Sequence, residues 1–413
     1  MSQLDDYRAD HLILLVGGNP LPNYVAARVL TKENAKVSLI YSKDSRTIAE
    51  RLKEVLSGLF EFASTEPVDE SRADSIQRQV KRALSQFPDV GVVGLHYTGG
   101  TKAMAVHAYR AVEAWAKSNN RQAIFSYLDA RTHKIVFDSP SDEVYVGGKL
   151  ALTLNEMLDL HGWPLGSPQP RTDPILPKTA CAIAAAYTEG KKDGVQLYSC
   201  WKKQELHYKC KASGQWKRKD ELRQIKLAWP TGFLSPIADA LKEETGQVGQ
   251  EELNIGAVKL FENPIDLCEW LDGAWLEDRV LYALYNLPSD LKPQQGQAFR
   301  GLNVKINGKN FELDVAAVLG YQLFGFTCGT TVGDGAEKKL KLKLFEGLLR
   351  TRQIGGDQAR TALVCIYEDP DKLQAEARQQ IDPDGQIRVF GCKHLKDLEN
   401  ELAHWIRSQR KLS

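Results

Sequence analysis

The chain of 413 residues is long enough for two or three domains, and its 54 basic and 53 acidic residues nearly cancel, so affinity for nucleic acid would need a local cluster of charge. The seven cysteines are odd in number and form no Cys-x-x-Cys pair, which argues against a disulfide framework and against a zinc knuckle. The N-terminus lacks the basic and apolar regions of a secretory signal, and no apolar run approaches the ~20 residues of a membrane span, so we expect a cytoplasmic protein without a membrane partner.

The first part of the chain alternates short apolar runs with helical patterns. Strands are expected at residues 11–16, 36–41, 89–95 and 124–127, and helices at residues 47–59 and 101–116. This alternation continues to about Asp138. It predicts an α/β fold with a largely parallel sheet.

Two of the expected strands end in glycine-rich loops. The first strand leads into Gly17, Gly18 and Asn19, and the strand at residues 89–95 leads into Thr98, Gly99, Gly100, Thr101 and Lys102. In a parallel sheet such loops precede helix N-termini, whose N–H groups attract phosphate. A lysine in the first helical turn opposes the helix dipole, so Lys102 indicates an anionic ligand, although a solvated lysine is an equally simple interpretation. Neither loop has the spacing of a P-loop or of a dinucleotide fingerprint.

Residues 162–177 contain five prolines, which exclude a helix and a central strand. We place the main boundary there. The expected domains are an N-terminal domain at 1–160, a proline-rich linker at 161–177, a middle basic segment at 178–260 and a C-terminal domain at 261–413.

The middle segment is expected to contain helices at 179–187 and 235–244, β-like alternation at 195–211 and a turn at 213–216. Residues 191–226 carry eleven Lys or Arg against four Asp or Glu, interleaved with Tyr198, Trp201, Tyr208 and Trp216. Basic residues among aromatic residues are typical of a surface that binds a nucleic-acid strand. A β-hairpin with buried aromatic residues and solvated lysines is the more common explanation.

The C-terminal domain is expected to contain a helix at 275–285, a hairpin at 302–318 that turns at Asn307-Gly308, a strand at 321–328, a helix at 337–351 and a strand at 361–366. Glu277 shares the inward helical face of Val280, Leu281 and Leu284. Asp314 lies on the strand face opposite Leu313 and Val315, so two carboxylates are expected near one another.

The N-terminal part resembles a CARF domain, the Rossmann-like sensor of type III CRISPR systems. The resemblance lies in the Tyr97–Lys102 segment, in residues 17–20 and in Tyr41-Ser42-Lys43. It implies a homodimer that binds a cyclic oligoadenylate, usually cyclic tetra-adenylate, and a two-fold axis suits a ring with its own two-fold symmetry. The pocket residues that it implies are Gly17, Gly18, Asn19, Ser42, Thr98, Gly99, Gly100, Thr101 and Lys102.

The C-terminal part resembles the PD-(D/E)XK restriction-endonuclease-like domains that are fused to CARF domains. The resemblance implies that Asp314 and Glu277 bind Mg²⁺ or Mn²⁺ for cleavage of DNA or RNA. However, Thr327 and Gly329 occupy the positions at which the family's Glu and Lys are expected. Either Lys343 and Glu346, which are one helical turn apart, replace the missing groups, or the domain is an inactive scaffold whose residues 338–343 form a solvated basic turn.

Three functions therefore remain open. The first is a metal-dependent nuclease controlled by cyclic oligoadenylate. The second is a nuclease-dead protein whose CARF domain cleaves the ring without metal, with Lys102 and either Ser42 or Thr98 as the catalytic residues. The third is a ligand-gated protein that binds nucleic acid or another partner without cutting it.

Overall fold

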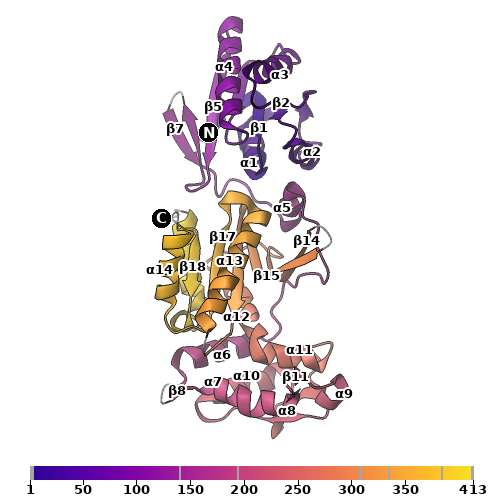
Figure 1. The fold of residues 1–413 in the computed structure, drawn as a ribbon, viewed down its shortest axis with the longest axis vertical. Helices are drawn as coiled ribbons and strands as arrows, with labels where there is room; N and C mark the ends of the chain where they lie inside the picture. The colour runs from indigo at the N-terminus through magenta and orange to yellow at the C-terminus, as the bar shows by residue number, and fades with distance from the viewer. Residues whose placement is uncertain are drawn as a thin grey trace.

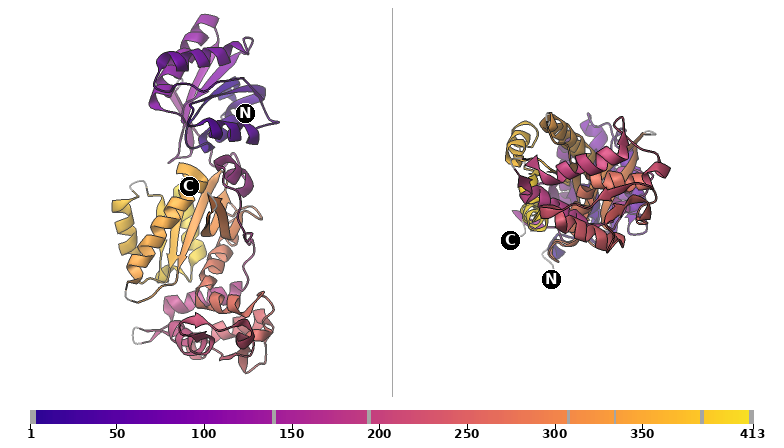
Figure 2. Two further views of the ribbon diagram at one scale, coloured as in Figure 1. Left: turned by 45° about the vertical axis from the view of Figure 1, so that its right-hand side comes forward. Right: turned by 90° about the horizontal axis from the view of Figure 1, so that it is seen from below.

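The structure, a computed structural model, describes residues 4–138, 141–192, 195–306, 309–333, 335–382 and 385–410. Three parts are stacked along the long axis of the molecule: the N-terminal sheet at one end, a second sheet in the middle and a mainly helical part at the other end (Figure 1). The helical part follows the N-terminal sheet in the chain but lies farthest from it in space, and a second view agrees (Figure 2).

The N-terminal sheet has seven strands in the order β3-β2-β1-β4-β5-β6-β7. The first five are parallel, and the last two form an antiparallel hairpin at the edge. Helices α1, α2 and α5 cover one face, and α3 and α4 cover the other. The elements are β1 (Ala9–Val16), α1 (Leu21–Leu30), β2 (Thr31–Tyr41), α2 (Arg46–Val55), β3 (Glu61–Phe62), α3 (Ala73–Ser85), β4 (Val92–His96), α4 (Lys102–Asn119), β5 (Gln122–Asp129), β6 (Lys134–Asp138), β7 (Ser141–Tyr145) and α5 (Leu154–His161).

The second sheet has five strands in the order β14-β15-β16-β17-β18. The first three are antiparallel, and the last three are parallel. Helices α12 and α15 pack on one face, and α13 and α14 on the other. The elements are α12 (Trp275–Tyr285), β14 (Ala298–Ile306), β15 (Lys309–Leu319), β16 (Gln322–Gly329), α13 (Ala336–Gly355), β17 (Arg360–Cys365), α14 (Pro370–Gln380), β18 (Ile387–Phe390) and α15 (Leu398–Arg410).

These two sheets confirm the predicted α/β fold class. The predicted turn at Asn307-Gly308 lies outside the described residues. Within the described ranges, no helix is long and apolar enough to cross a membrane.

The helical part combines short helices with two-residue and three-residue strands. Its elements are α6 (Pro177–Glu189), β8 (Lys191–Lys192), β9 (Val195–Gln196), α7 (Leu197–Trp201), a π-helical turn (Lys202–His207), α8 (Tyr208–Cys210), β10 (Lys211–Ala212), β11 (Gln215–Trp216), α9 (Lys219–Leu222), β12 (Lys226–Ala228), α10 (Ser235–Thr245), β13 (Glu252–Asn254), α11 (Pro264–Glu269) and a second π-helical turn (Trp270–Ala274).

The expected β-like alternation at 195–211 is wrong, because most of this segment is helical. Its buried apolar residues Tyr198, Trp201, Leu206 and Cys210 are spaced by three, five and four positions. The five-residue step falls at the π-helical turn, which widens the helix and disguises the usual period of 3.6 residues.

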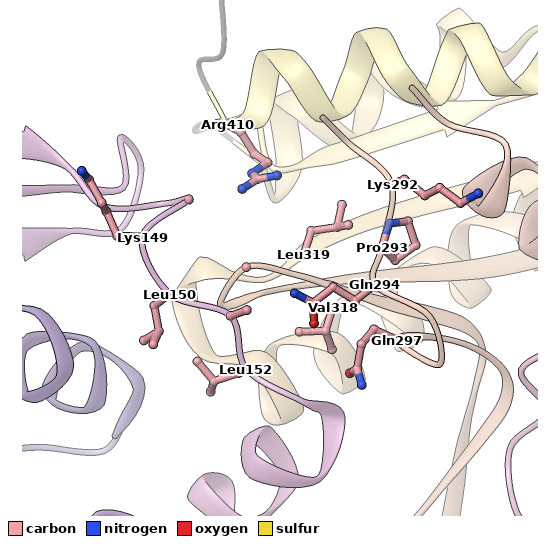
Figure 3. A pocket seen from close by; sticks show the side chains of 13 residues that line it. Lys149, Leu150, Leu152, Lys292, Pro293, Gln294, Gln297, Val318, Leu319 and Arg410 are labelled. Carbon is pink, nitrogen blue, oxygen red and sulfur yellow. The ribbon is translucent and has the colours of Figure 1, made fainter. Parts of the chain in front are cut away.

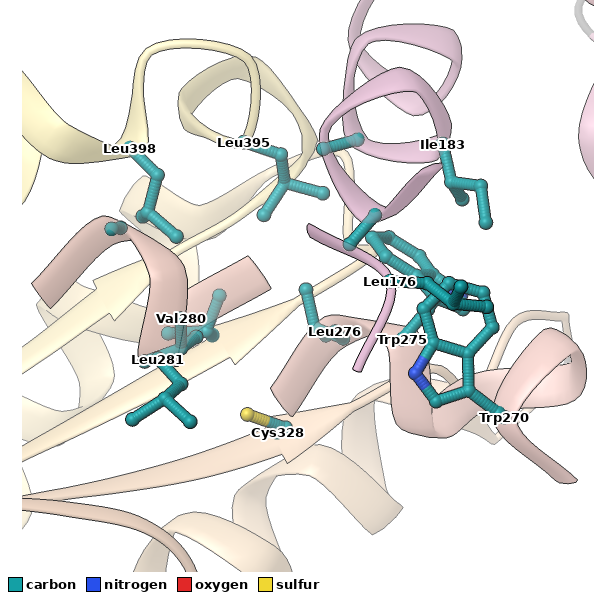
Figure 4. Close-up of a cluster of buried hydrophobic side chains, with 14 of the residues drawn as sticks. Leu176, Ile183, Trp270, Trp275, Leu276, Val280, Leu281, Cys328, Leu395 and Leu398 are labelled. Carbon is teal, nitrogen blue, oxygen red and sulfur yellow. The ribbon is translucent and has the colours of Figure 1, made fainter. Parts of the chain in front are cut away.

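One cluster of buried apolar side chains joins the helical part to the second sheet (Figure 4). Trp270, Trp275 and Leu276 lie between α6 and strand β16, and the ring of Trp275 stacks on Tyr187 of α6 with centroids 5.5 Å apart. The helical part is therefore held to the second sheet by a continuous core.

Candidate functional site

The first candidate site lies where three adjacent parallel strands end. Strand β1 pairs with β2 on one side and with β4 on the other. Because the carboxyl ends of parallel strands meet at one edge, the loops that contain Gly17, Ser42 and Thr98 lie side by side.

Two glycines in these loops allow the loops to pack against each other. A Cβ atom added to Gly99 would lie 2.1 Å from the carbonyl oxygen of Leu15, and one added to Gly17 would lie 2.7 Å from the backbone nitrogen of Gly100. Gly100 itself has a φ of +75°, which favours glycine. Gly17 and Gly99 are predicted to line the ligand pocket, and in the structure they also allow the two loops to contact each other. Gly18 faces open space.

A buried histidine positions Thr98. His96 contacts the hydroxyl of Ser126 through Nδ1, at 3.1 Å, and the hydroxyl of Thr98 through Nε2, at 2.9 Å. Thr98 Oγ1 also accepts a hydrogen bond from the N–H of Leu128 at 2.6 Å. Burial lowers the pKa of His96 to about 3, so the ring is neutral. The Thr98 hydroxyl is thus used within the protein, and the sequence analysis assigned no role to His96.

Three other predicted pocket residues have different environments. Ser42 is buried, and its N–H donates to the hydroxyl of Ser45 at 3.0 Å. Thr101 caps helix α4 by accepting from the N–H of Met104 at 3.2 Å. Lys102 is exposed and makes no ion pair with any residue that the structure describes, so its ammonium group is available to a ligand.

Asn19 turns towards the second sheet. Its Nδ2 donates to Oε1 of Gln358 at 3.0 Å, while its Oδ1 accepts from the N–H of Leu21 at 3.1 Å. The fit is close, because a Cβ atom on Gly356 would lie 2.6 Å from Asn19 Nδ2. Asn19 was predicted to line the ligand pocket. In the structure its side chain instead connects the loop after β1 to the turn after α13.

The junction of the two sheets also contains a cavity of about 310 Å³, lined by Lys149 and Arg410 among others (Figure 3). Beside it, Arg410 Nη2 donates to the carbonyl oxygen of Gly147 at 3.0 Å, and the N–H of Leu152 donates to the carbonyl oxygen of Gly320 at 2.8 Å. These hydrogen bonds add to the contact that Asn19 makes.

The second candidate site is centred on Asp314 of β15. Its Oδ2 accepts from the N–H of Cys328 at 2.6 Å and from the hydroxyl of Thr327 at 3.2 Å, and it lies 2.9 Å from Nζ of Lys343. Burial alone would lower the pKa of Lys343, but Asp314 raises it above its usual value. A lysine from helix α13 therefore reaches the acid from the side, although Gly329 stands where the family's lysine is expected.

Glu277 lies near Asp314 but is bound to an arginine. Arg300 donates from Nε to Glu277 at 2.9 Å and from Nη1 to the buried Asp278 at 2.9 Å, so two acids share its charge. Burial raises the pKa of Glu277 to about 7. Glu312, two residues before Asp314 on β15, has a pKa raised by burial and by Asp314. Glu312 was not predicted as a site residue, although its i, i+2 spacing from Asp314 on one strand indicates a shared face.

The structure does not bring Glu346 to these acids. Its carboxylate forms an ion pair with Arg350, one helical turn further along α13. Arg350 in turn donates from Nη1 to the carbonyl oxygen of Glu312 at 2.7 Å. Of the two proposed replacements, only Lys343 contacts Asp314.

The expected Mg²⁺ or Mn²⁺ site does not fit this arrangement of side chains. Across the described ranges, no three His, Cys, Asp or Glu side chains converge as a metal-binding group. Asp314 is paired with Lys343, and Glu277 with Arg300. A neighbouring cavity of about 530 Å³ is lined by two arginines and by Glu262, Asp266, Glu269, Glu277 and Glu312. Excess negative charge there disfavours a bare phosphate.

The raised pKa of Glu277 predicts a specific dependence of stability on pH. The folded protein holds this proton more tightly than the unfolded chain, so its contribution to stability is full below about pH 4.5 and is lost as the pH rises through about 7. The shift corresponds to on the order of 3 kcal/mol. Relative to the wild type, Glu277→Gln should therefore gain stability across this interval in urea unfolding. Parallel stability curves for the two proteins would contradict the prediction.

No protein-family model matches the chain, and a search of curated proteins finds no match. The solved structures that are similar over nearly the whole length include the following two. Protein VC1899 from Vibrio cholerae has a TM-score of 0.66 at 17% identity, covering 97% of this chain and 98% of that chain. Can2 from Sulfobacillus thermosulfidooxidans, in complex with cyclic tetra-adenylate, has a TM-score of 0.64 at 17% identity, covering 96% of this chain and 99% of that chain. The chain therefore shares its α/β fold with both proteins.

Proposed function

We propose that the chain is a cytoplasmic type III CRISPR ancillary protein that binds cyclic oligoadenylate, above all cyclic tetra-adenylate, and thereby controls its C-terminal half. The observation that carries the proposal is the strand edge at which Gly17 and Gly99 allow two loops to pack together, beside Lys102, which is exposed and has no ion-pair partner among the described residues. The similar structure of Can2, which contains cyclic tetra-adenylate, supports it.

The ring is proposed to bind across a homodimer. Val106, one helical turn after Lys102, is 55% exposed, and Tyr127 on the neighbouring strand β5 is 36% exposed. The ring of Tyr127 lies 5.7 Å from that of Tyr97, which precedes Thr98. A second copy that covers this apolar face would bring two Lys102 side chains near the two-fold axis, where a ring with two-fold symmetry can meet both.

Control of the C-terminal half is proposed to pass through Asn19. The loop that contains Asn19 lies at the edge of the sheet where the ligand is proposed to bind. The side chain of Asn19 contacts Gln358 directly. A ring that moves this loop would change the turn after α13, which leads from the helix carrying Lys343 into the second sheet.

Hydrogen–deuterium exchange tests this coupling. Cyclic tetra-adenylate should slow exchange in the loops after β1, β2 and β4 and should also alter exchange in residues 352–360. In Asn19→Ala and Gln358→Ala the protection of the loops should persist, while the change in residues 352–360 should be lost. Gln353→Ala is the matched control, because Gln353 is exposed in the same segment. An unaltered distant response in both variants would contradict the coupling.

The C-terminal half is proposed to act on DNA or RNA, and Asp314, Lys343 and Glu277 are the residues on which phosphodiester cleavage would depend. Because the side chains do not form a metal site in this arrangement, we assign no step to a metal. The ion-paired state of Asp314 and Glu277 favours one alternative, a ring-gated protein that binds nucleic acid without cutting it.

A further inference from the structure

One side of the helical part carries aromatic side chains that the core leaves largely or partly exposed. Of the four aromatic residues in the basic stretch, Tyr198 and Trp201 are buried. By contrast, Tyr208 is 81% exposed, and Trp216 is half-buried at the end of the β10–β11 hairpin. Only Tyr208 and Trp216 can therefore meet a ligand.

Three nitrogen-bearing side chains, two lysines and a histidine, meet at a single acid. Asp272 Oδ1 lies 3.2 Å from Nζ of Lys202 and 2.7 Å from Nε2 of His207, and its Oδ2 lies 2.9 Å from Nζ of Lys211. Burial alone would raise the pKa of Asp272, but Lys202, Lys211 and His207 lower it to about 2. The carboxylate of Asp272 fixes the ammonium groups of Lys202 and Lys211 in place. Its single negative charge neutralises only one of their two positive charges.

Trp216 is held rigidly by this group. Nζ of Lys211 lies 4.1 Å from the centroid of its ring, and the ring of His207 meets it edge-on at 6.2 Å. The side chain is thus ordered before any ligand arrives, which reduces the entropy cost of binding.

Part of the positive charge in this stretch has no acidic partner among the described residues. Lys203, Lys217 and Lys219 make no ion pair with any residue in the described part of the chain. Two of the nearby acids have local partners: Glu205 pairs with Lys209 at 2.7 Å, and Asp220 pairs with Arg223 at 3.3 Å. In a chain with a formal net charge of +1, this is a local source of affinity for phosphate.

The same group adjoins the second sheet near Asp314. Gly273 directly follows Asp272, and a Cβ atom on Gly273 would lie 2.6 Å from Oγ1 of Thr330. Thr330 is three residues beyond Thr327, which contacts Asp314, so about 10 Å of strand separates them. The group around Asp272 therefore lies next to the strand end that leads back to the Asp314–Lys343 pair.

We infer that Lys203, Tyr208, Lys211, Trp216 and Lys217 form a binding surface for single-stranded nucleic acid. Its aromatic rings stack on bases, and its lysines contact phosphates. Exposed rings favour single strands, because a duplex hides the faces of its bases. The inference rests on the proposed function only in taking nucleic acid as the partner of the C-terminal half.

Fluorescence anisotropy with the full-length protein tests this surface. Labelled single-stranded DNA, single-stranded RNA and a duplex of the same sequence are titrated in EDTA, with and without cyclic tetra-adenylate. Single strands should bind more tightly than the duplex. Lys203→Glu combined with Lys217→Glu should weaken binding about tenfold or more and reduce the salt dependence by about 1.4 in log–log slope. Lys81→Glu combined with Arg378→Glu, which makes the same charge change at exposed sites elsewhere, should bind like the wild type.

Replacement of the aromatic ring of Tyr208 separates the contribution of base stacking to binding from the contribution of charge. Tyr208→Ala should weaken single-strand binding about fivefold or more, whereas Tyr208→Phe should retain it. Because Tyr208 is largely exposed, both variants should unfold at the wild-type temperature. Three results would each overturn the inference. The first is equal binding of duplex and single strand, and the second is wild-type affinity in both the lysine double variant and Tyr208→Ala. The third is no binding of any strand with or without cyclic tetra-adenylate. If the protein binds single strands but does not bind cyclic tetra-adenylate, the proposed function is wrong and the inferred nucleic-acid surface is unaffected.

Discussion

Lys102→Ala should weaken the binding of cyclic tetra-adenylate about 100-fold in a calorimetric titration. Lys102 is exposed in the first turn of α4 and has no ion-pair partner within the described ranges, so its charge is available to a phosphate of the ring. A hydrogen bond to a charged group contributes about 1.5–3 kcal/mol, or about 10- to 150-fold in affinity. A homodimer would lose this contact twice.

Two control variants sharpen the test of Lys102. Lys117→Ala removes an exposed lysine from the last turn of the same helix and should leave the affinity unchanged. Lys102→Arg keeps the charge and should restore most of the binding. If Lys102→Ala binds as the wild type does, or if Lys117→Ala is equally weak, the assignment of Lys102 to the ligand is wrong.

Asp314→Asn should lower ring-stimulated cleavage of DNA or RNA about 1000-fold, whether or not the assay contains Mn²⁺. Asp314 is the acid that contacts Lys343, Thr327 and the backbone of β16, so its charge organises the whole group. Lys343→Met should cause a similar loss, and the double variant should be little worse than either single variant, because residues that act as a unit are not additive.

Glu346→Gln is the matched control for Asp314. Glu346 lies on the same helix as Lys343, but its carboxylate pairs with Arg350, so the variant should cleave at the wild-type rate. Sensitivity of cleavage to Glu346→Gln, without sensitivity to Asp314→Asn, would reverse the assignment. If the wild type cuts no substrate, the ring-gated binding protein is the surviving proposal. Measuring the amount of intact cyclic oligoadenylate in the same assay detects cleavage of this ligand that depends on Lys102.

Local patterns were sufficient to predict much of the fold. The apolar alternation of the first part predicts strands β1, β2, β4 and β5, and the periodicity of α12 predicts its observed bounds, Trp275–Tyr285. The helix over residues 197–210 could not be recognised, since a π-helical turn interrupts its period. The edge hairpin β6–β7 was missed, although β6 alternates in burial, with Ile135 and Phe137 buried.

In the candidate sites, too, local sequence patterns do not indicate contacts between residues that are far apart in the chain. Gly17 and Gly99 stand out in the sequence, but their contact with each other depends on the sheet that brings their loops together. The partner of Asn19 is Gln358, 339 positions away, and no local pattern indicates such a pair. The Glu346–Arg350 ion pair, by contrast, has the i, i+4 spacing that a helix predicts, so its separation from Asp314 was foreseeable.

Calorimetric titration of the wild-type protein with cyclic tetra-adenylate tests the central claim most directly. The proposed homodimer, with the loops of Gly17, Ser42 and Gly99 at its ligand edge, predicts saturable binding of one ring per two chains. Absence of binding to cyclic tetra-adenylate and to every other cyclic oligoadenylate would contradict it.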